Sequence, residues 1–326
     1  HVGYPKTGTT TLQKYLFPNF DNIDYHGTYP ERDGYQKFGI DRQILLDLGY
    51  MPAHAFANRY SSEIPELYRK LCNKTLISAE ILTFCVFKKA YNKGIYISAS
   101  CEEVAEKLRL FFPEEMYDVK ILITIRTQPE MITSLYAQSY SHFYSQHQKT
   151  NEFIKFVNIF TDSKFHDHPF RVGLDYLHTY NSYEKLFGKE NISIHLLEEL
   201  SASPASFYND VCEFVGAEID SATLRCILSK RANVRSTTQG YKVINETSLL
   251  DRLQFLKRRF IPSANIKIPE NIIRLLNRKK MKSDVTVSQS IILENEQINY
   301  IVNNYSLSNT VLSSKLGLKM KKYGYY

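Results

Sequence analysis

The 326-residue sequence contains no tryptophan, few glycines and only five cysteines. The cysteines are odd in number and show no C-x-x-C spacing, which argues against a disulfide framework and against a thiolate zinc site. No run of 18 apolar residues occurs, so no membrane-spanning segment is expected. We therefore expect reduced thiols in the core of a protein from a reducing compartment. The five are Cys72, Cys85, Cys101, Cys212 and Cys226.

Acidic residues are scarce in the last third of the chain. Residues 229–326 contain 18 Lys and Arg but only 6 Asp and Glu. The whole chain contains 41 Lys and Arg and 34 Asp and Glu. Such a segment suggests an anionic partner, and a solvated basic face is the alternative. No repeat or linker divides the sequence. We expect a single domain over residues 1–326, with a core over about 1–240 and a basic, helical C-terminal region over about 241–326.

Short apolar segments alternate with helical patterns along the chain. Residues 119–125 form an almost continuous apolar run, typical of a central parallel strand that is covered on both faces. The alternation predicts an α/β fold with a P-loop-type, doubly wound, mostly parallel sheet, helices on both faces and a helical C-terminal elaboration. About five central strands are expected, at the start of the chain and at 23–27, 74–80, 119–125 and 191–197. Helices are expected after Ser100, which forms a capping box with Glu103, from Pro129, over 176–187, after Ser203 as N-cap, and over 295–316.

The first eleven residues predict a strand, a tight turn rich in hydroxyl groups, and a helix. Backbone N–H groups at such a helix start favour an anion. Gly3 and Gly8 match the two glycines of the nucleotide P-loop G-x-x-x-x-G-K-[ST], but Thr9 stands where the lysine belongs. The only lysine, Lys6, lies within the turn. This suits a ligand with one 5′-phosphate and a transferable group beside it, whereas an ordinary Gly/Thr turn is the alternative.

A second candidate anion site follows the 119–125 strand. Arg126 stands at its carboxyl end, and Ser134 lies eight residues later in the next helix. A guanidinium can form two parallel hydrogen bonds to a phosphate, and the hydroxyl can add a third. The alternative is a strand-end arginine and a helix-surface hydroxyl. Ligands bind at the carboxyl ends of parallel strands, where the opening turn, Glu80 and Arg126 are all expected.

The P-K-T-G-T-T run and the Arg126–Ser134 spacing together resemble the sulfotransferases that use PAPS (3′-phosphoadenosine 5′-phosphosulfate). Further similarity lies at 183–200, 214–216 and 308–325, so the resemblance covers nearly the whole chain. It implies PAPS as cofactor, adenosine 3′,5′-bisphosphate as product, and no metal. The implied 5′-phosphosulfate site comprises Lys6, Thr7, Gly8, Thr9, Thr10 and Thr11, and the implied 3′-phosphate site comprises Arg126 and Ser134.

The resemblance also implies catalytic roles. Lys6 would stabilise the charge that develops on the leaving phosphate. Glu80 would be the base, because family members place a His or Glu at this strand end; a helix N-terminal Glu is the alternative, and His26 is the runner-up base. The R-K-G-x-x-G loop of cytosolic members is absent here. Arg231 or Arg235, preferably Arg235, would take its place at the 3′-phosphate.

The expected reaction is sulfuryl transfer to a hydroxyl of a carbohydrate, such as a polysaccharide, glycolipid or oligosaccharide, anionic ones included. The Tyr/His stretch over 136–147 either lines the acceptor cleft or packs in the core. His166-Asp167-His168 lacks a third ligand, so no metal site is expected there. No nucleic-acid partner is expected. A bacterial cytoplasm is the expected location, and the Golgi lumen is the alternative if an N-terminal anchor has been removed.

Two other functions compete with this one. The first is a nucleotide kinase-like P-loop enzyme, against which the missing lysine after Gly8 argues. The second is a non-catalytic nucleotide- or polyanion-binding module on the same fold, against which the presence of Lys6 and Glu80 argues.

Overall fold

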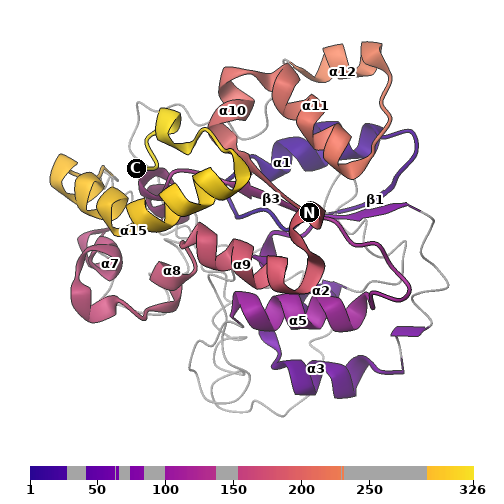
Figure 1. The fold of residues 1–326 in the computed structure, drawn as a ribbon, viewed down its shortest axis with the longest axis horizontal. Coiled ribbons are helices and arrows are strands. Elements are labelled where there is room, and N and C mark those ends of the chain that lie inside the picture. The colour runs from indigo at the N-terminus through magenta and orange to yellow at the C-terminus, as the bar shows by residue number, and fades with distance from the viewer. Residues whose placement is uncertain are drawn as a thin grey trace, which may run out of the picture.

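Four short strands form two parallel pairs, with helices on both sides (Figure 1). β1 (Asp24–His26) pairs with β2 (Thr75–Ile77), and β3 (Ile121–Ile125) pairs with β4 (Ile192–Leu196). The mixed α/β class and the parallel strands are as predicted. The computed structural model describes residues 1–27, 42–62, 64–65, 74–83, 100–136, 153–228, 230 and 292–326.

Residues 1–4 lie between the two strand pairs. The N–H groups of Val2 and Tyr4 donate to carbonyls of β3 at 2.9 and 3.0 Å. On the other side, the N–H of Ala79, just after β2, donates to the carbonyl of His1 at 3.0 Å. These hydrogen bonds join the two strand pairs. They also place the opening turn, which follows Tyr4, beside the carboxyl end of β3. The described residues contain four strands, so a continuous sheet of about five strands stays a prediction.

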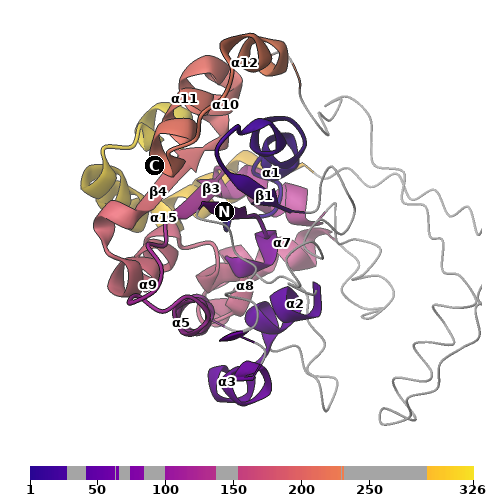
Figure 2. The same cartoon turned by 90° about the vertical axis from the view of Figure 1, so that its right-hand side faces the viewer.

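Both faces of β3 are buried, which explains its continuous apolar run. Ile121, Ile123 and Ile125 belong to one core cluster, which α5 (Cys101–Phe111) and α9 (Tyr176–Phe187) also line. Leu122 belongs to a second cluster, together with residues of α11 (Pro204–Val215) and of the helical segment after the opening turn. Figures 1 and 2 show α5 and α9 on one side of the strands and α1 and α11 on the other. Helices therefore cover both faces, as predicted.

The described residues contain further helices, some of them not predicted. Residues 128–136 are helical, which agrees with a start near Pro129. The other α-helices within the described ranges are α1 (Thr9–Thr11), α2 (Arg42–Tyr50), α3 (Ala53–Tyr60), α7 (Phe153–Thr161), α8 (Pro169–Val172), α10 (Leu197–Ala202), α12 (Ser221–Leu228) and α15 (Asn295–Leu316). A π-helical turn, η1, covers Leu12–Leu16. The 3₁₀ turns are η2 (Phe17–Asn19), η4 (Glu80–Leu82), η5 (Ser163–Phe165), η6 (Lys189–Asn191) and η7 (Met320–Tyr323).

Two predicted helix starts have different outcomes. The capping box is confirmed, because the Ser100 hydroxyl accepts from the Glu103 N–H at 3.2 Å and the Glu103 carboxylate accepts from the Ser100 N–H at 3.1 Å. Pro204 is at the first position of α11 and Ser203 is its N-cap residue, as predicted, but the Ser203 side chain makes no cap hydrogen bond. Ser203 also ends α10, where its N–H donates to the carbonyl of Glu199 at 2.8 Å.

The C-terminal segment packs on the first core cluster. α15 contacts α9 and α7, and Tyr325 near the chain end is fully buried. Most of the basic C-terminal region lies outside the described residues, so the single-domain division stays a prediction. No helix among the described residues combines the length and the apolar character that crossing a bilayer requires.

Candidate active site

The opening turn has an unusual backbone. Lys6 has a φ of +66°, and within the described part of the chain no other non-glycine residue has a left-handed conformation. Gly8 follows with a φ of +80°. A Cβ on Gly8 would lie 2.8 Å from Cδ1 of Leu197, and a Cβ on Gly3 would lie 2.2 Å from Oγ1 of Thr124. Both glycines are therefore required by close packing against β3 and the segment after β4.

Exposed and buried residues alternate along this turn. Lys6, Gly8 and Thr10 are partly exposed, whereas Thr7 and Thr9 are buried. The partly exposed residues are the ones that a ligand can reach from solvent. Thr9 begins α1, which continues into η1 and η2, and the first N–H groups of a helix have no intrahelical acceptor. The turn therefore presents a positive charge and helix-start N–H groups to the same space.

The Thr7 hydroxyl faces the protein interior. Its Oγ1 donates to the Tyr4 carbonyl at 2.5 Å and lies 2.6 Å from Oγ1 of Thr124 in β3. These contacts hold the turn against the strand. An anion in the turn would therefore meet the backbone of Thr7 and not its hydroxyl.

Glu80 directly adjoins the turn. Its carboxylate accepts a hydrogen bond from the Thr9 hydroxyl. Burial raises its pKa above the usual value of 4.5, while the Thr9 hydrogen bond and the positive charge of Lys6 act in the opposite direction. The predicted strand over 74–80 is shorter than expected, because β2 ends at Ile77 and Glu80 begins the 3₁₀ turn η4. The structure thus brings together Lys6, Thr9 and Glu80, which the sequence analysis assigned to one site.

His26 has an acidic partner on its own strand. It is almost fully buried at the end of β1, and its Nε2 lies 2.8 Å from the Asp24 carboxylate. Its carbonyl accepts from the Ser78 N–H at 3.0 Å. These contacts place His26 within the β1–β2 pair.

Arg126 lies at the same edge as the turn. It directly follows β3, and the neighbouring chain at Tyr4 is hydrogen-bonded to Thr124, two residues before it. The Arg126 side chain is 26% exposed, and its Nε donates to the Glu130 carboxylate at 2.7 Å. Ser134 is buried on the helix over 128–136. The guanidinium therefore retains two terminal nitrogens at the carboxyl edge of the strands.

Several predicted residues lie elsewhere. Arg231, Arg235 and the stretch over 137–147 lie outside the described residues. Tyr136 is buried, and its ring packs on those of Phe153 and Phe156 at centroid distances of 5.0 and 5.5 Å, which favours the core interpretation for this residue. Within the described ranges, no group of three or more His, Cys, Asp or Glu is arranged to hold a metal ion.

Glu198 also lies at this edge, and its position was not predicted from the sequence. It follows β4 at the start of α10, where its carboxylate accepts from the Thr127 N–H at 3.0 Å and from the Tyr325 hydroxyl at 2.9 Å. Burial raises its pKa. The signal available in the sequence was an acidic residue immediately after the predicted strand over 191–197, comparable to Glu80 at the end of the predicted strand over 74–80.

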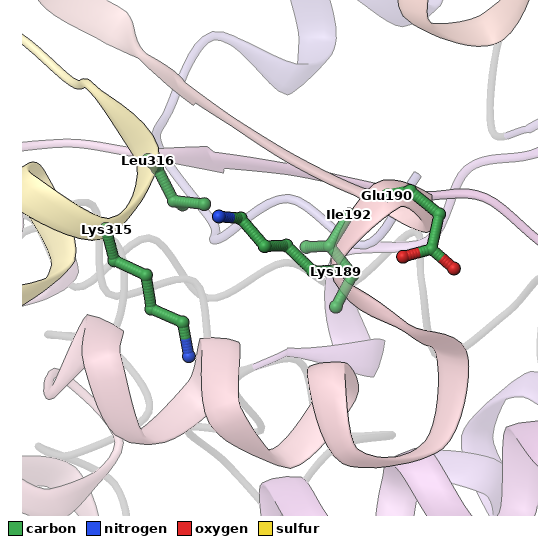
Figure 3. Close-up of a pocket in the computed structure, with 5 residues that line it drawn as sticks. All are labelled: Lys189, Glu190, Ile192, Lys315 and Leu316. Atoms are coloured by element: carbon green, nitrogen blue, oxygen red, sulfur yellow. The ribbon is translucent and has the colours of Figure 1, made fainter.

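A pocket of about 430 Å³ lies at the opposite end of β4 (Figure 3). Ile192, the first residue of β4, lines it, so it does not belong to the carboxyl edge. Lys315 extends from α15 toward α9, where it pairs with Glu184. The complete lining is Lys189, Glu190, Ile192, Lys315 and Leu316.

Comparison with known proteins identifies the family. The family model described as sulfotransferase domain matches residues 2–268, and the chain therefore belongs to this family. No curated protein matches the chain. A crystal structure of a sulfotransferase from Alicyclobacillus acidocaldarius is similar, with 14% identity, a TM-score of 0.49, and coverage of 99% of this chain and 96% of that chain. Transfer of a sulfuryl group is the activity that family membership supports.

Proposed function

We propose that the protein transfers the sulfuryl group of PAPS to a hydroxyl group of a carbohydrate. The observation that carries the proposal is the grouping of Lys6, Thr9 and Glu80 beside the carboxyl end of β3, where Arg126 stands. A base, a positive charge and a second phosphate-binding cation then share one edge of the fold, and the family supplies the type of reaction.

The residues at this edge fit such a cofactor. The backbone of Thr7 and the helix-start N–H groups of Gly8, Thr9 and Thr10 would hold the 5′-phosphosulfate, because they lack intrahelical acceptors. Gly8 lets the turn pack closely against Leu197, since a Cβ at this position would lie 2.8 Å from Cδ1 of that leucine. Thr11 is buried behind this turn and would support it. When bound, PAPS would supply the sulfuryl group and leave as adenosine 3′,5′-bisphosphate.

Lys6 and Glu80 would perform the proton and charge chemistry. The Glu80 carboxylate would accept the proton of the acceptor hydroxyl as that oxygen forms its bond to sulfur, and burial makes the carboxylate more basic. The Lys6 ammonium would stabilise the negative charge left on the 5′-phosphate when its bond to sulfur breaks. Neither role requires a metal ion.

Arg126 and Ser134 would bind the 3′-phosphate. The two terminal nitrogens of Arg126 can form the fork that suits a phosphate, and Glu130 already orients the guanidinium through Nε. Arg235 stays the proposed additional contact. A carbohydrate acceptor agrees with the basic residues of the last third of the chain, which would favour an anionic polysaccharide. The location in a bacterial cytoplasm also stays a prediction.

The test is calorimetric titration of the purified protein with adenosine 3′,5′-bisphosphate and, separately, with ATP and Mg²⁺. We expect binding of the bisphosphate. Binding of ATP alone would overturn the proposal in favour of a kinase-like enzyme. Labelled PAPS offered with a panel of carbohydrate, phenol and amine acceptors would then identify the acceptor class, and label transfer to phenols alone would contradict the carbohydrate assignment.

A further inference from the structure

The end of the chain contacts the turn that contains Arg126. Tyr325 is fully buried, and its hydroxyl donates to Glu198 at 2.9 Å. The other carboxylate oxygen of Glu198 accepts from the N–H of Thr127, the residue after Arg126, at 3.0 Å. A single carboxylate therefore connects the chain end to the first residue beyond the guanidinium.

A second connection runs through an amide pair. Asn309 of α15 and Gln128 exchange hydrogen bonds through their side-chain amides, both at 3.2 Å, and both residues are fully buried. The Asn309 amide nitrogen also donates to the Tyr325 carbonyl at 2.9 Å. The Tyr325 hydroxyl is thus connected to Thr127 through Glu198. The Tyr325 carbonyl is connected to Gln128 through Asn309.

Arg126 itself is held from the remaining side. The Tyr176 hydroxyl donates to the Arg126 carbonyl at 2.5 Å, and the Tyr176 and Tyr325 rings contact each other at a centroid distance of 6.3 Å. The carbonyl and the N–H of the peptide between Arg126 and Thr127 are therefore both held by hydrogen bonds, from Tyr176 and to Glu198 respectively. These hydrogen bonds fix the point from which the Arg126 side chain starts, and the Nε hydrogen bond to Glu130 then directs the guanidinium.

We propose that Tyr325, Glu198 and Asn309 form a C-terminal clamp that positions Arg126 for the 3′-phosphate of the cofactor. The inference rests on the proposed function, because Arg126 is assigned to that phosphate there. The three residues are positioning residues, since their hydrogen bonds go to the backbone and side chains around Arg126. The clamp makes the affinity for a 3′-phosphate depend on Tyr325 and its hydrogen bonds.

The test compares two nucleotides that differ only in the 3′-phosphate. Tyr325→Phe keeps the buried ring and removes the hydrogen bond to Glu198. We expect calorimetry to show affinity for adenosine 3′,5′-bisphosphate that is weaker by about threefold to tenfold, the usual effect of one hydrogen bond, with affinity for adenosine 5′-phosphate unchanged. Glu198→Ala, which also frees the Thr127 N–H, should give the same selective loss to a larger extent.

The matched control is Tyr326→Phe, because the Tyr326 hydroxyl contacts Ser313 at 3.2 Å and not the Arg126 turn. It should leave both affinities unchanged. In an Arg126→Ala background, Tyr325→Phe should have no further effect on bisphosphate affinity, since the clamp acts through Arg126. Thermal unfolding of each variant checks that it folds.

The outcomes separate the clamp from the proposed function. If wild-type protein binds the bisphosphate and Tyr325→Phe binds it equally well, the clamp is wrong and the proposed function stands. Equal losses for both nucleotides, or a full additional loss in the Arg126→Ala background, would show a merely structural role. Absence of bisphosphate binding by wild-type protein would overturn both.

Discussion

The Thr9 hydroxyl donates a hydrogen bond to the Glu80 carboxylate. Thr9 begins the helix that follows the opening turn, and Glu80 begins the turn after β2, so this contact connects the proposed phosphosulfate site with the proposed base. The hydrogen bond favours the ionised carboxylate, whereas burial favours the protonated form and is the larger effect. Glu80 is thereby kept basic while being held in one orientation.

A pH profile tests Glu80 as the base. Only the ionised carboxylate accepts a proton, so kcat should rise with pH through the pKa of Glu80, which burial places above 4.5. Glu80→Gln should lower kcat by about 10²-fold or more and remove this rise. Thr9→Val should move the rise to higher pH, because the carboxylate loses the donor that lowers its pKa. Initial rates with labelled PAPS measure both, and an unchanged profile in Glu80→Gln would shift the role to His26 or solvent.

Lys6 combines a proposed catalytic charge with a strained backbone. Its φ of +66° costs about 1–2 kcal/mol for an L-residue, and strain of this kind is common at functional sites. Lys6→Ala should lower kcat by about 10²–10³-fold, because the leaving phosphate loses its positive partner. Lys6→Gly should lose the same activity while unfolding at a higher temperature than Lys6→Ala, since glycine adopts positive φ freely.

Lys14→Ala is the matched control for the charge. Lys14 is an exposed residue of the π-helical turn that follows, so its removal should change kcat by less than about twofold if only Lys6 acts at the site. Full activity in Lys6→Ala would end its assignment to the leaving group.

Comparing Gly8→Ala with Gly317→Ala measures how much the close packing around the opening turn contributes to stability. Both have positive φ, +80° and +69°, so alanine should cost about 1–2 kcal/mol of unfolding free energy at either position. At Gly8 the new Cβ would also lie 2.8 Å from Leu197, whereas at Gly317 nothing lies within 4 Å. Gly8→Ala should therefore be the more destabilising and should weaken nucleotide binding, and Gly317→Ala should leave binding unchanged. Urea unfolding and calorimetry measure the two effects, and equal losses in both variants would contradict a special role of the turn.

The strands and the main helices could be predicted because their signals are local. The apolar run before Arg126 identifies β3, and the Ser100–Glu103 capping box identifies the start of α5. The helical pattern at the end of the chain predicts α15 with the bounds that the structure gives, Asn295–Leu316. Each of these features depends on neighbours within a few residues.

The site could be predicted only in part, because side-chain direction depends on tertiary contacts. A threonine-rich turn does not indicate that the Thr7 hydroxyl turns inward to Thr124 while Thr10 stays partly exposed. The contact between Glu198 and Tyr325 joins residues far apart in the chain, and no local pattern specifies it. The sequence therefore supports the choice of edge and of charged residues, and the structure supplies their partners.

Substitutions at Arg126 and Glu130 should change the affinity for the 3′-phosphate in opposite directions. Arg126→Lys replaces a fork of two nitrogens by one ammonium and should weaken binding of adenosine 3′,5′-bisphosphate by about tenfold, with affinity for adenosine 5′-phosphate unchanged. Glu130→Gln should strengthen bisphosphate binding by about twofold, because it removes a negative charge that pairs with Arg126 at 2.7 Å on the exposed side of the helix. Arg225→Lys, an exposed substitution on α12, is the matched control and should change neither affinity. Calorimetry at low salt measures all three variants. Weaker bisphosphate binding by Glu130→Gln would show that the carboxylate orients Arg126 for the phosphate more than it repels the ligand.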